Sequence, residues 1–170
     1  MFRERGFAAS SMRDLAETVG IEAAVARGQG GIAHAAELFY HEMGPERASK
    51  ERIARHAAIM AEAGTWLQST MVVTHRVEDG YANVDREAPD LAYMNPLQRG
   101  LWAEDSVLFE SAKNRPDAER FYSKAYELSC VAIRIAHEAG VRVLTGTDFP
   151  NPYVVEGFSL HEEFELLVGG

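Results

Sequence analysis

Two residues of this sequence have side chains of the types that bind divalent metal ions, and each ends a short apolar segment. His34 closes the segment 30–34, which lies between glycines and a helical pattern. Asp148 closes the segment 140–148, whose apolar residues precede it. Imidazole and carboxylate are ligands of Zn²⁺, and a carboxylate beside a metal-activated water can take its proton. We therefore predict that His34 is a metal ligand and that Asp148 is a ligand, a general base or both.

Both residues also have a simpler structural explanation. Asp148 could only cap the turn that follows it, and His34 could be a packed residue at a strand end. Their shared position favours a function, because α/β folds place their chemistry at the carboxyl ends of parallel strands. A catalytic zinc usually takes three protein ligands. The missing ligands would have to come from His75, His41, His161 or residues outside this sequence.

The elements that must position these residues alternate between strands and helices. Short apolar segments bounded by glycine and proline favour buried strands, and apolar residues at helical spacing favour helices. The predicted strands are 30–34, 65–73 and 140–148, and the predicted helices are 46–63, 116–139 and one that opens at Ser159. Consecutive strand-helix units predict a parallel sheet. We expect an α/β fold over 1–170, as one incomplete domain whose few strands form an open sheet or part of a (β/α)8 barrel.

Several other polar residues have less specific interpretations. His75 follows the second predicted strand and could face a ligand. We favour exposure to solvent or a supporting position beside the site's ligands. His56 lies beside the polar face of its helix, so we expect it to be solvated. Ser159 and Glu162 have the spacing of a capping box. Cys130 lies inside an apolar helical pattern and is expected to be a packed thiol, not a nucleophile.

The segment 77–117 is acidic and is interrupted by Pro89 and Pro96. Short helices are expected around 94–102. An excursion of this length between a strand and its helix is typically a lid or specificity loop. It could equally be an inert surface insertion, and the sequence favours neither.

The charge balance excludes one class of partner. The chain has 17 Lys and Arg against 26 Asp and Glu, a formal net charge of -9. Nucleic-acid binding needs clustered cations that follow the phosphates, so we expect small molecules or peptides instead. No apolar run approaches the ~20 residues of a membrane-spanning helix. The sequence indicates neither a compartment nor an oligomeric state.

Four segments together carry a resemblance to a known family. They are Gly-Ile-Ala-His34-Ala-Ala-Glu-Leu, a predicted strand with Ser69-Thr70-Met71-Val72-Val73, Ala-His-Glu-Ala-Gly-Val-Arg-Val-Leu-Thr-Gly-Thr-Asp148 and Gly157-Phe-Ser-Leu-His-Glu-Glu-Phe-Glu-Leu-Leu-Val168. Their order resembles the carboxyl-terminal half of metal-dependent amidohydrolases, in the branch with imidazolonepropionase-like and Xaa-Pro dipeptidase-like members. The resemblance covers about residues 20–74 and 118–168.

The resemblance implies a fold and a set of site residues. That family is a (β/α)8 TIM barrel with one or two divalent ions, for which Zn²⁺ is expected here. Its ligands are a His-x-His after strand one, a Lys or Glu after strand four, histidines after strands five and six, and an Asp after strand eight. By this match His34 is the sixth-strand histidine and Asp148 the eighth-strand aspartate, which also transfers a proton. Thr70, His75 and His161 would have supporting or substrate-contacting roles.

The resemblance also implies a reaction, and it shows which of the family's ligands this sequence lacks. The family hydrolyses amide, peptide or cyclic amide C–N bonds with metal-activated water, so the substrate would be a small molecule or dipeptide. No His-x-His and no histidine precedes His34. We therefore expect a fragment carrying about strands six to eight, without its natural amino terminus and inactive as this chain. The alternative is a non-catalytic α/β half-barrel or binding module without metal.

Overall fold

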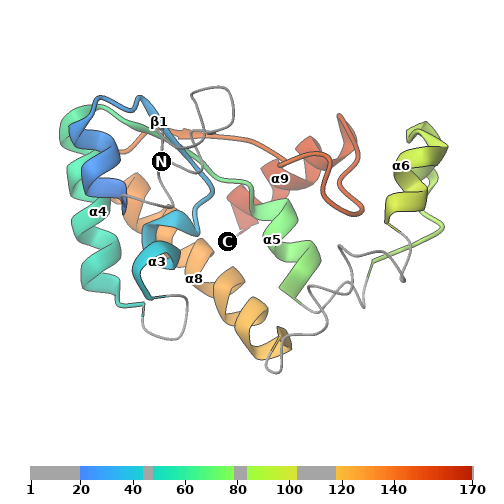
Figure 1. Ribbon diagram of the computed structural model, residues 1–170, viewed down its shortest axis with the longest axis horizontal. Helices are drawn as coiled ribbons and strands as arrows, with labels where there is room; N and C mark the ends of the chain where they lie inside the picture. The colour runs from blue at the N-terminus through green and yellow to red at the C-terminus, as the bar shows by residue number, and fades with distance from the viewer. Residues whose placement is uncertain (1–19, 44–47, 79–83, 103–117, 170) are drawn as a thin grey trace, which may run out of the picture. The chain divides into compact units, whose positions relative to one another are not determined.

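The computed structural model describes residues 20–43, 48–78, 84–102 and 118–169 (Figure 1). The chain divides into two compact units. The first, here called the sheet unit, comprises residues 1–69 and 131–144, and the second, the helical unit, comprises residues 70–130 and 145–170. The predicted helix starts at 46 and 116 lie outside the described residues.

The sheet unit contains a small parallel sheet. Its strands are β1 (Gly31–Ala33), β2 (Trp66–Gln68) and β3 (Val143–Leu144), in the order β1-β2-β3. Ile32 pairs with Leu67 across β1 and β2, and both side chains are buried. The expectation of an α/β fold with a parallel sheet is confirmed, although each strand is shorter than predicted.

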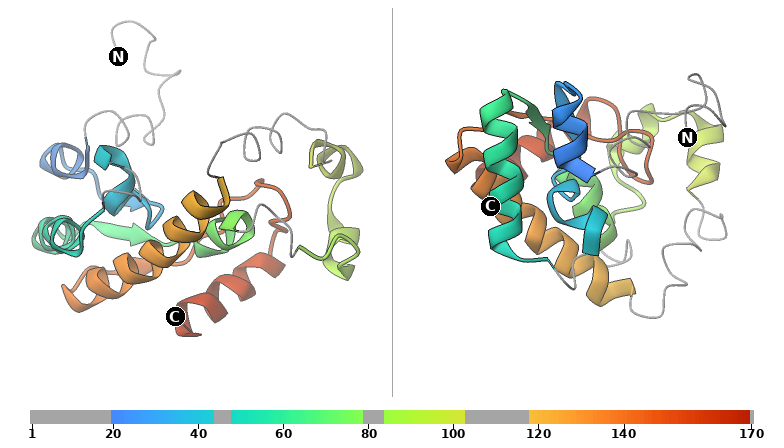
Figure 2. Two further views of the ribbon diagram at one scale, coloured as in Figure 1. Left: turned by 90° about the horizontal axis from the view of Figure 1, so that it is seen from below. Right: turned by 60° about the vertical axis from the view of Figure 1, so that its left-hand side comes forward.

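Helices accompany this sheet, and one of them, over residues 50–63, lies within the predicted range 46–63. Residues 20–26 are helical, followed by α3 (Glu37–Met43) and α4 (Lys50–Ala63). The helix over 20–26 lies beside α4 (Figure 2), and Glu22 forms an ion pair with Arg55 at 2.9 Å. The Ser49 hydroxyl accepts the N–H of Arg52 at the start of α4. Gly64 ends the helix with a φ of 69°, a left-handed conformation that favours glycine.

The long predicted helix is α8 (Ala118–Glu138). Its residues 118–130 belong to the helical unit and its residues 131–138 to the sheet unit. The expected buried face is present at Ala125 and Ala132. Ser129 and Ala136 are also buried, and the four residues share one face of the helix.

The helical unit begins with a correction to the predicted strand over 65–73. After β2 the chain turns at Thr70, whose φ is 52°, and continues as α5 (Met71–Glu78). The β-branched residues Val72 and Val73 favour a strand locally. Here the N–H of Val72 donates to the Glu163 carboxylate at 2.7 Å, so a distant residue stabilises the first turn of a helix instead.

The segment 84–102 contains the short helices expected around 94–102. They are η2 (Pro89–Tyr93) and α6 (Pro96–Leu101), and the Asn95 side chain accepts the N–H of Leu97 at the start of α6. Leu91, Met94 and Trp102 form a small core with Val155. Residues 79–83 and 103–117 of the predicted excursion lie outside the described part of the chain.

The last helix, α9 (Phe158–Gly169), packs on α5 (Figure 1). The predicted capping box is wrong. Ser159 is already inside the helix, where its hydroxyl accepts the N–H of Val155 at 2.9 Å. Glu162 forms an ion pair with Arg76 instead of reaching back to the helix start. Within the described ranges, no helix combines the length and apolar character needed to cross a membrane.

Candidate functional site

His34 follows the last residue of β1 and is half-buried. Its φ is 70°, a left-handed conformation that is uncommon for residues other than glycine. Its carbonyl accepts the N–H of Glu37 at 3.1 Å, and the next residue, Ala35, donates to the carbonyl of Ser69 at 3.0 Å. These bonds fix the backbone on both sides of His34 at the carboxyl end of the strand.

Asp148 lies four residues beyond the end of β3, not at the strand end as predicted, and its φ is 55°. The Asn151 side-chain amide donates to its Oδ2 at 2.8 Å and to its carbonyl at 2.6 Å. The backbone N–H of Asn151 donates to the same carbonyl at 3.2 Å. Among the described residues, the carboxylate is therefore bound by a side-chain amide, not by the backbone N–H groups that a turn cap would bind.

Each strand of the sheet is followed by a non-glycine residue with a positive φ. His34 directly follows β1, Thr70 comes one residue further from the end of β2, and Asp148 lies four residues beyond the end of β3, with φ values of 70°, 52° and 55°. A positive φ is especially unfavourable for a β-branched residue such as Thr70. Backbone outliers of this kind cost about 1–3 kcal/mol each and concentrate at functional sites. All three are residues for which the sequence predicts a role.

The sequence predicted His75 at a strand end, and this is wrong. His75 lies in the helix α5. Its Nδ1 lies 3.1 Å from Glu78 Oε1 without forming a hydrogen bond. The imidazole ring lies 5.0 Å from the ring of Tyr126. Burial, followed by the neighbouring Cys130 and Glu78, raises the pKa of Tyr126 to about 12.

The remaining predicted residues have varied surroundings. Thr70 is buried, and its carbonyl accepts the Thr74 hydroxyl at 3.4 Å. His161 is exposed on α9. His41 lies in α3, and its side chain is outside the described part of the structure.

The described residues do not by themselves complete a metal site. His34 belongs to the sheet unit and Asp148 to the helical unit. Among the described residues, no three His, Cys, Asp or Glu side chains are grouped so that they could hold a metal ion. His34 and Asp148 have the donor chemistry that zinc needs, but a catalytic zinc requires a third protein ligand.

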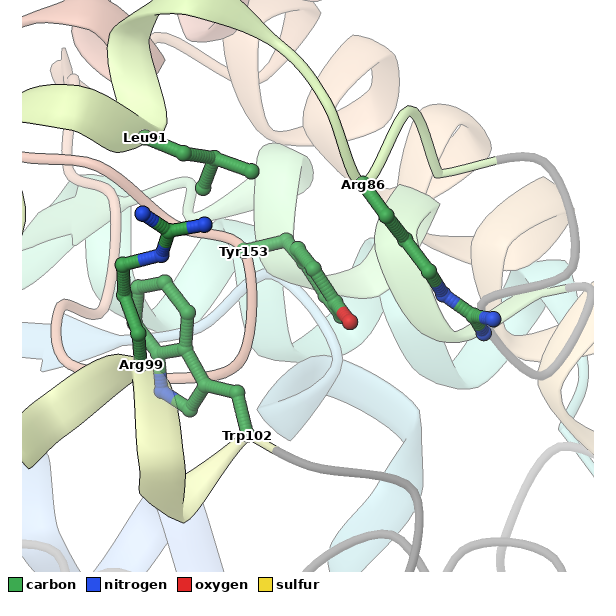
Figure 3. A pocket seen from close by; sticks show the side chains of 5 residues that line it. All are labelled: Arg86, Leu91, Arg99, Trp102 and Tyr153. Carbon is green, nitrogen blue, oxygen red and sulfur yellow. The ribbon is translucent and has the colours of Figure 1, made fainter. Parts of the chain in front are cut away.

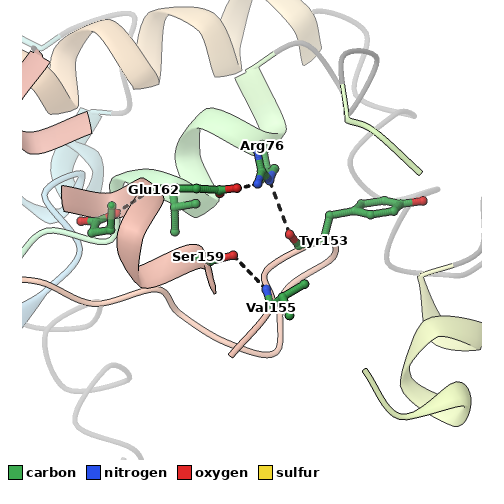
Figure 4. Close-up of polar contacts among 7 residues, drawn as sticks. Arg76, Tyr153, Val155, Ser159 and Glu162 are labelled. Carbon is green, nitrogen blue, oxygen red and sulfur yellow. Dashed lines mark hydrogen bonds and ion pairs between the residues drawn. The ribbon is translucent and has the colours of Figure 1, made fainter. Parts of the chain in front are cut away.

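The turn that carries Asp148 continues into a loop that is held against α5 and α9 (Figure 4). Arg76 of α5 forms an ion pair with Glu162 of α9, and its Nε donates to the carbonyl of Tyr153 at 3.4 Å. The Trp102 indole donates to the carbonyl of Pro150 at 3.2 Å. The loop is thereby fixed at several points by side chains from other elements of the helical unit.

Two buried polar residues were missed by sequence reasoning. His56, expected to be solvated, is only 6% exposed, and its Nδ1 donates to the carbonyl of Leu38 at 2.8 Å. With Ile53, Ala57 and Met60 it occupies positions i, i+3, i+4 and i+7 of α4, so the helical spacing already placed it on the buried face. Glu163 is fully buried, which no local pattern predicts for a carboxylate.

No family model matches this chain, and neither a curated protein nor a solved structure matches it. The likeness to amidohydrolases therefore depends on the sequence motifs alone.

Proposed function

We propose that this chain supplies the carboxyl-terminal part of a metal-dependent amidohydrolase, corresponding to about strands six to eight of a (β/α)8 barrel. The complete enzyme would hydrolyse C–N bonds of amides, peptides or cyclic amides, with a small molecule or dipeptide as substrate. One observation carries the proposal: a non-glycine residue of positive φ follows β1 directly, β2 after one residue and β3 after three, and two of these residues are His34 and Asp148. The carboxyl ends of parallel strands are where barrel enzymes place their chemistry.

His34 and Asp148 would have different roles. The imidazole of His34 would be a metal ligand. The carboxylate of Asp148 would bind the ion or accept a proton from water, and the amide of Asn151, 2.8 Å from Oδ2, would hold it in one orientation. A bound divalent ion, with Zn²⁺ expected, would supply acidity by lowering the pKa of water to about 7. In a complete protein with one or two ions, the further ligands would come from residues outside the described ranges.

The test is the variant Asp148→Asn in a longer chain that contains this sequence. We expect one or two divalent ions per protomer in the parent, and a loss of turnover of roughly 10²–10⁴-fold in the variant on dipeptides or cyclic amides. The matched control is Glu156→Gln, which removes an exposed carboxylate from the same loop and should leave turnover unchanged. Full turnover in Asp148→Asn would exclude the proposal.

The second candidate is a non-catalytic α/β binding module without metal. A cavity lined by two arginines and two aromatic side chains in the helical unit favours it. Titration of the longer chain with Zn²⁺ separates the two functions, because only the hydrolase requires stoichiometric binding. For the 170-residue chain alone, we expect weak or no stoichiometric metal binding and no hydrolysis.

A further inference from the structure

The helical unit contains a small cavity beside the loop that follows Asp148. It has a volume of about 110 Å³ and is lined by Arg86, Leu91, Arg99, Trp102 and Tyr153 (Figure 3). A cavity of about 150 Å³ is enough for benzene. This one therefore has room for the end group of a small molecule and not for a whole cofactor.

The apolar side of the cavity is held in place by packing. Leu91 and Trp102 are 5% and 3% exposed and belong to one hydrophobic cluster with Met94 and Val155. The Trp102 indole N–H donates to the carbonyl of Pro150. The ring of Tyr153 lies 5.7 Å from that of Trp102. The indole N–H is thus already used, and this side offers a ligand an apolar surface.

The polar side of the cavity carries two exposed guanidinium groups. In Figure 3, that of Arg86 points away from that of Arg99, so one small anion would contact a single arginine. Within the described part of the chain, no carboxylate forms an ion pair with Arg99. Arg86 has contacts of its own, which makes Arg99 the stronger candidate. A cationic group at an apolar cavity stands out in a chain whose net charge is -9.

We propose that this cavity binds the carboxylate end of a small organic acid, with Arg99 as its cationic contact. The planar guanidinium matches a carboxylate through two parallel hydrogen bonds. The carbon next to the carboxylate would lie against Leu91 and Trp102. Phosphate has no such carbon and carries acceptor oxygens on all sides, so it suits this half-apolar cavity less well. Binding here does not require the proposed hydrolase activity.

The two tryptophans of the chain provide a direct measurement. They are Trp66 and Trp102, so in the variant Trp66→Phe the tryptophan emission reports on the cavity alone. Sodium propionate is the probe, and propionamide, of the same shape without charge, is its control at constant ionic strength. We expect a saturable change of emission with propionate and none with propionamide. Calorimetric titration of the unsubstituted chain with the same probes gives an independent measurement.

Variants of Arg99 test the assigned contact. Arg99→Gln should weaken propionate binding about tenfold or more, because a hydrogen bond to a charged group is lost. Arg99→Lys should have an intermediate affinity, since it keeps the charge and loses the planar fork. Arg134→Gln removes the same charge from an exposed position on α8 that does not line the cavity, and it should bind like the parent.

Three results would overturn the proposal. Equal responses to propionate and propionamide would remove the role of charge. Unchanged affinity in both Arg99 variants would remove the assigned contact. Tighter binding of inorganic phosphate than of propionate would show that the site does not select carboxylates.

Discussion

The Oε2 atom of Glu163 accepts the backbone N–H of Val72 at 2.7 Å and so joins two helices whose residues are 91 positions apart. Val72 is the second residue of α5, where backbone N–H groups have no partner within the helix. The amino-terminal end of a helix also favours negative charge. A fully buried residue of α9 thus accepts a backbone N–H in the first turn of α5.

Replacing Glu163 should therefore destabilise the helical unit. We expect Glu163→Gln to lower the free energy of unfolding by about 1–3 kcal/mol, because the charged acceptor is lost from a buried bond. The matched control is Glu165→Gln, an exposed position on the same helix, with an expected change within about 0.5 kcal/mol. Urea unfolding measures both variants, and equal stabilities would contradict the capping role.

His56 provides a second test of a buried hydrogen bond. In His56→Leu, the carbonyl of Leu38 loses the donor that now lies 2.8 Å away. Leaving that acceptor unsatisfied should reduce stability by about 1–3 kcal/mol. His161→Leu changes an exposed histidine in the same way and should be nearly neutral. If the two substitutions had the same effect on the denaturation midpoint, His56 would not be a structural residue.

Two glycines should respond oppositely to alanine. Gly64 has a φ of 69°, and an added Cβ would meet only Arg142 at 3.6 Å, an ordinary contact. The cost of Gly64→Ala is then backbone strain, about 1–2 kcal/mol. Gly100 lies within α6, and a Cβ there meets nothing within 4 Å. Gly100→Ala should stabilise by about 0.5–1 kcal/mol. Thermal unfolding shows whether each substitution raises or lowers the stability, and a stabilised Gly64→Ala variant would disprove the strain argument.

The raised pKa of Tyr126 leads us to expect a loss of stability at high pH. Burial raises its pKa from the ordinary value of 10 to about 12. The neutral phenol is thus favoured in the folded state. Its contribution to stability is complete below pH 10 and is lost as the pH rises from 10 to 12. Ultraviolet titration should resolve one late phenolate among the six tyrosines, and Tyr126→Phe should lack it. A late phenolate that persists in this variant would assign the shift to another tyrosine.

How much the sequence predicts depends on how local the cause is. The three strands and α8 follow from apolar spacing and from glycines, which act on neighbouring residues. The burial of His56 was also indicated by the spacing of apolar residues in α4, but its polar side chain led us to expect exposure to solvent. The helical start at Met71 was not predictable in this way, because Val72 and Val73 favour a strand and the capping carboxylate comes from Glu163.

By itself, the sequence determined the alternation of strands and helices and placed His34 directly after its strand. It could do so because periodicity and chain breaks act within a few residues. Only the tertiary structure decided that α5 begins where β2 was expected to continue, that Glu163 is buried and that Arg99, Trp102 and Tyr153 line one cavity. These features depend on partners far apart in the chain, which local patterns do not specify.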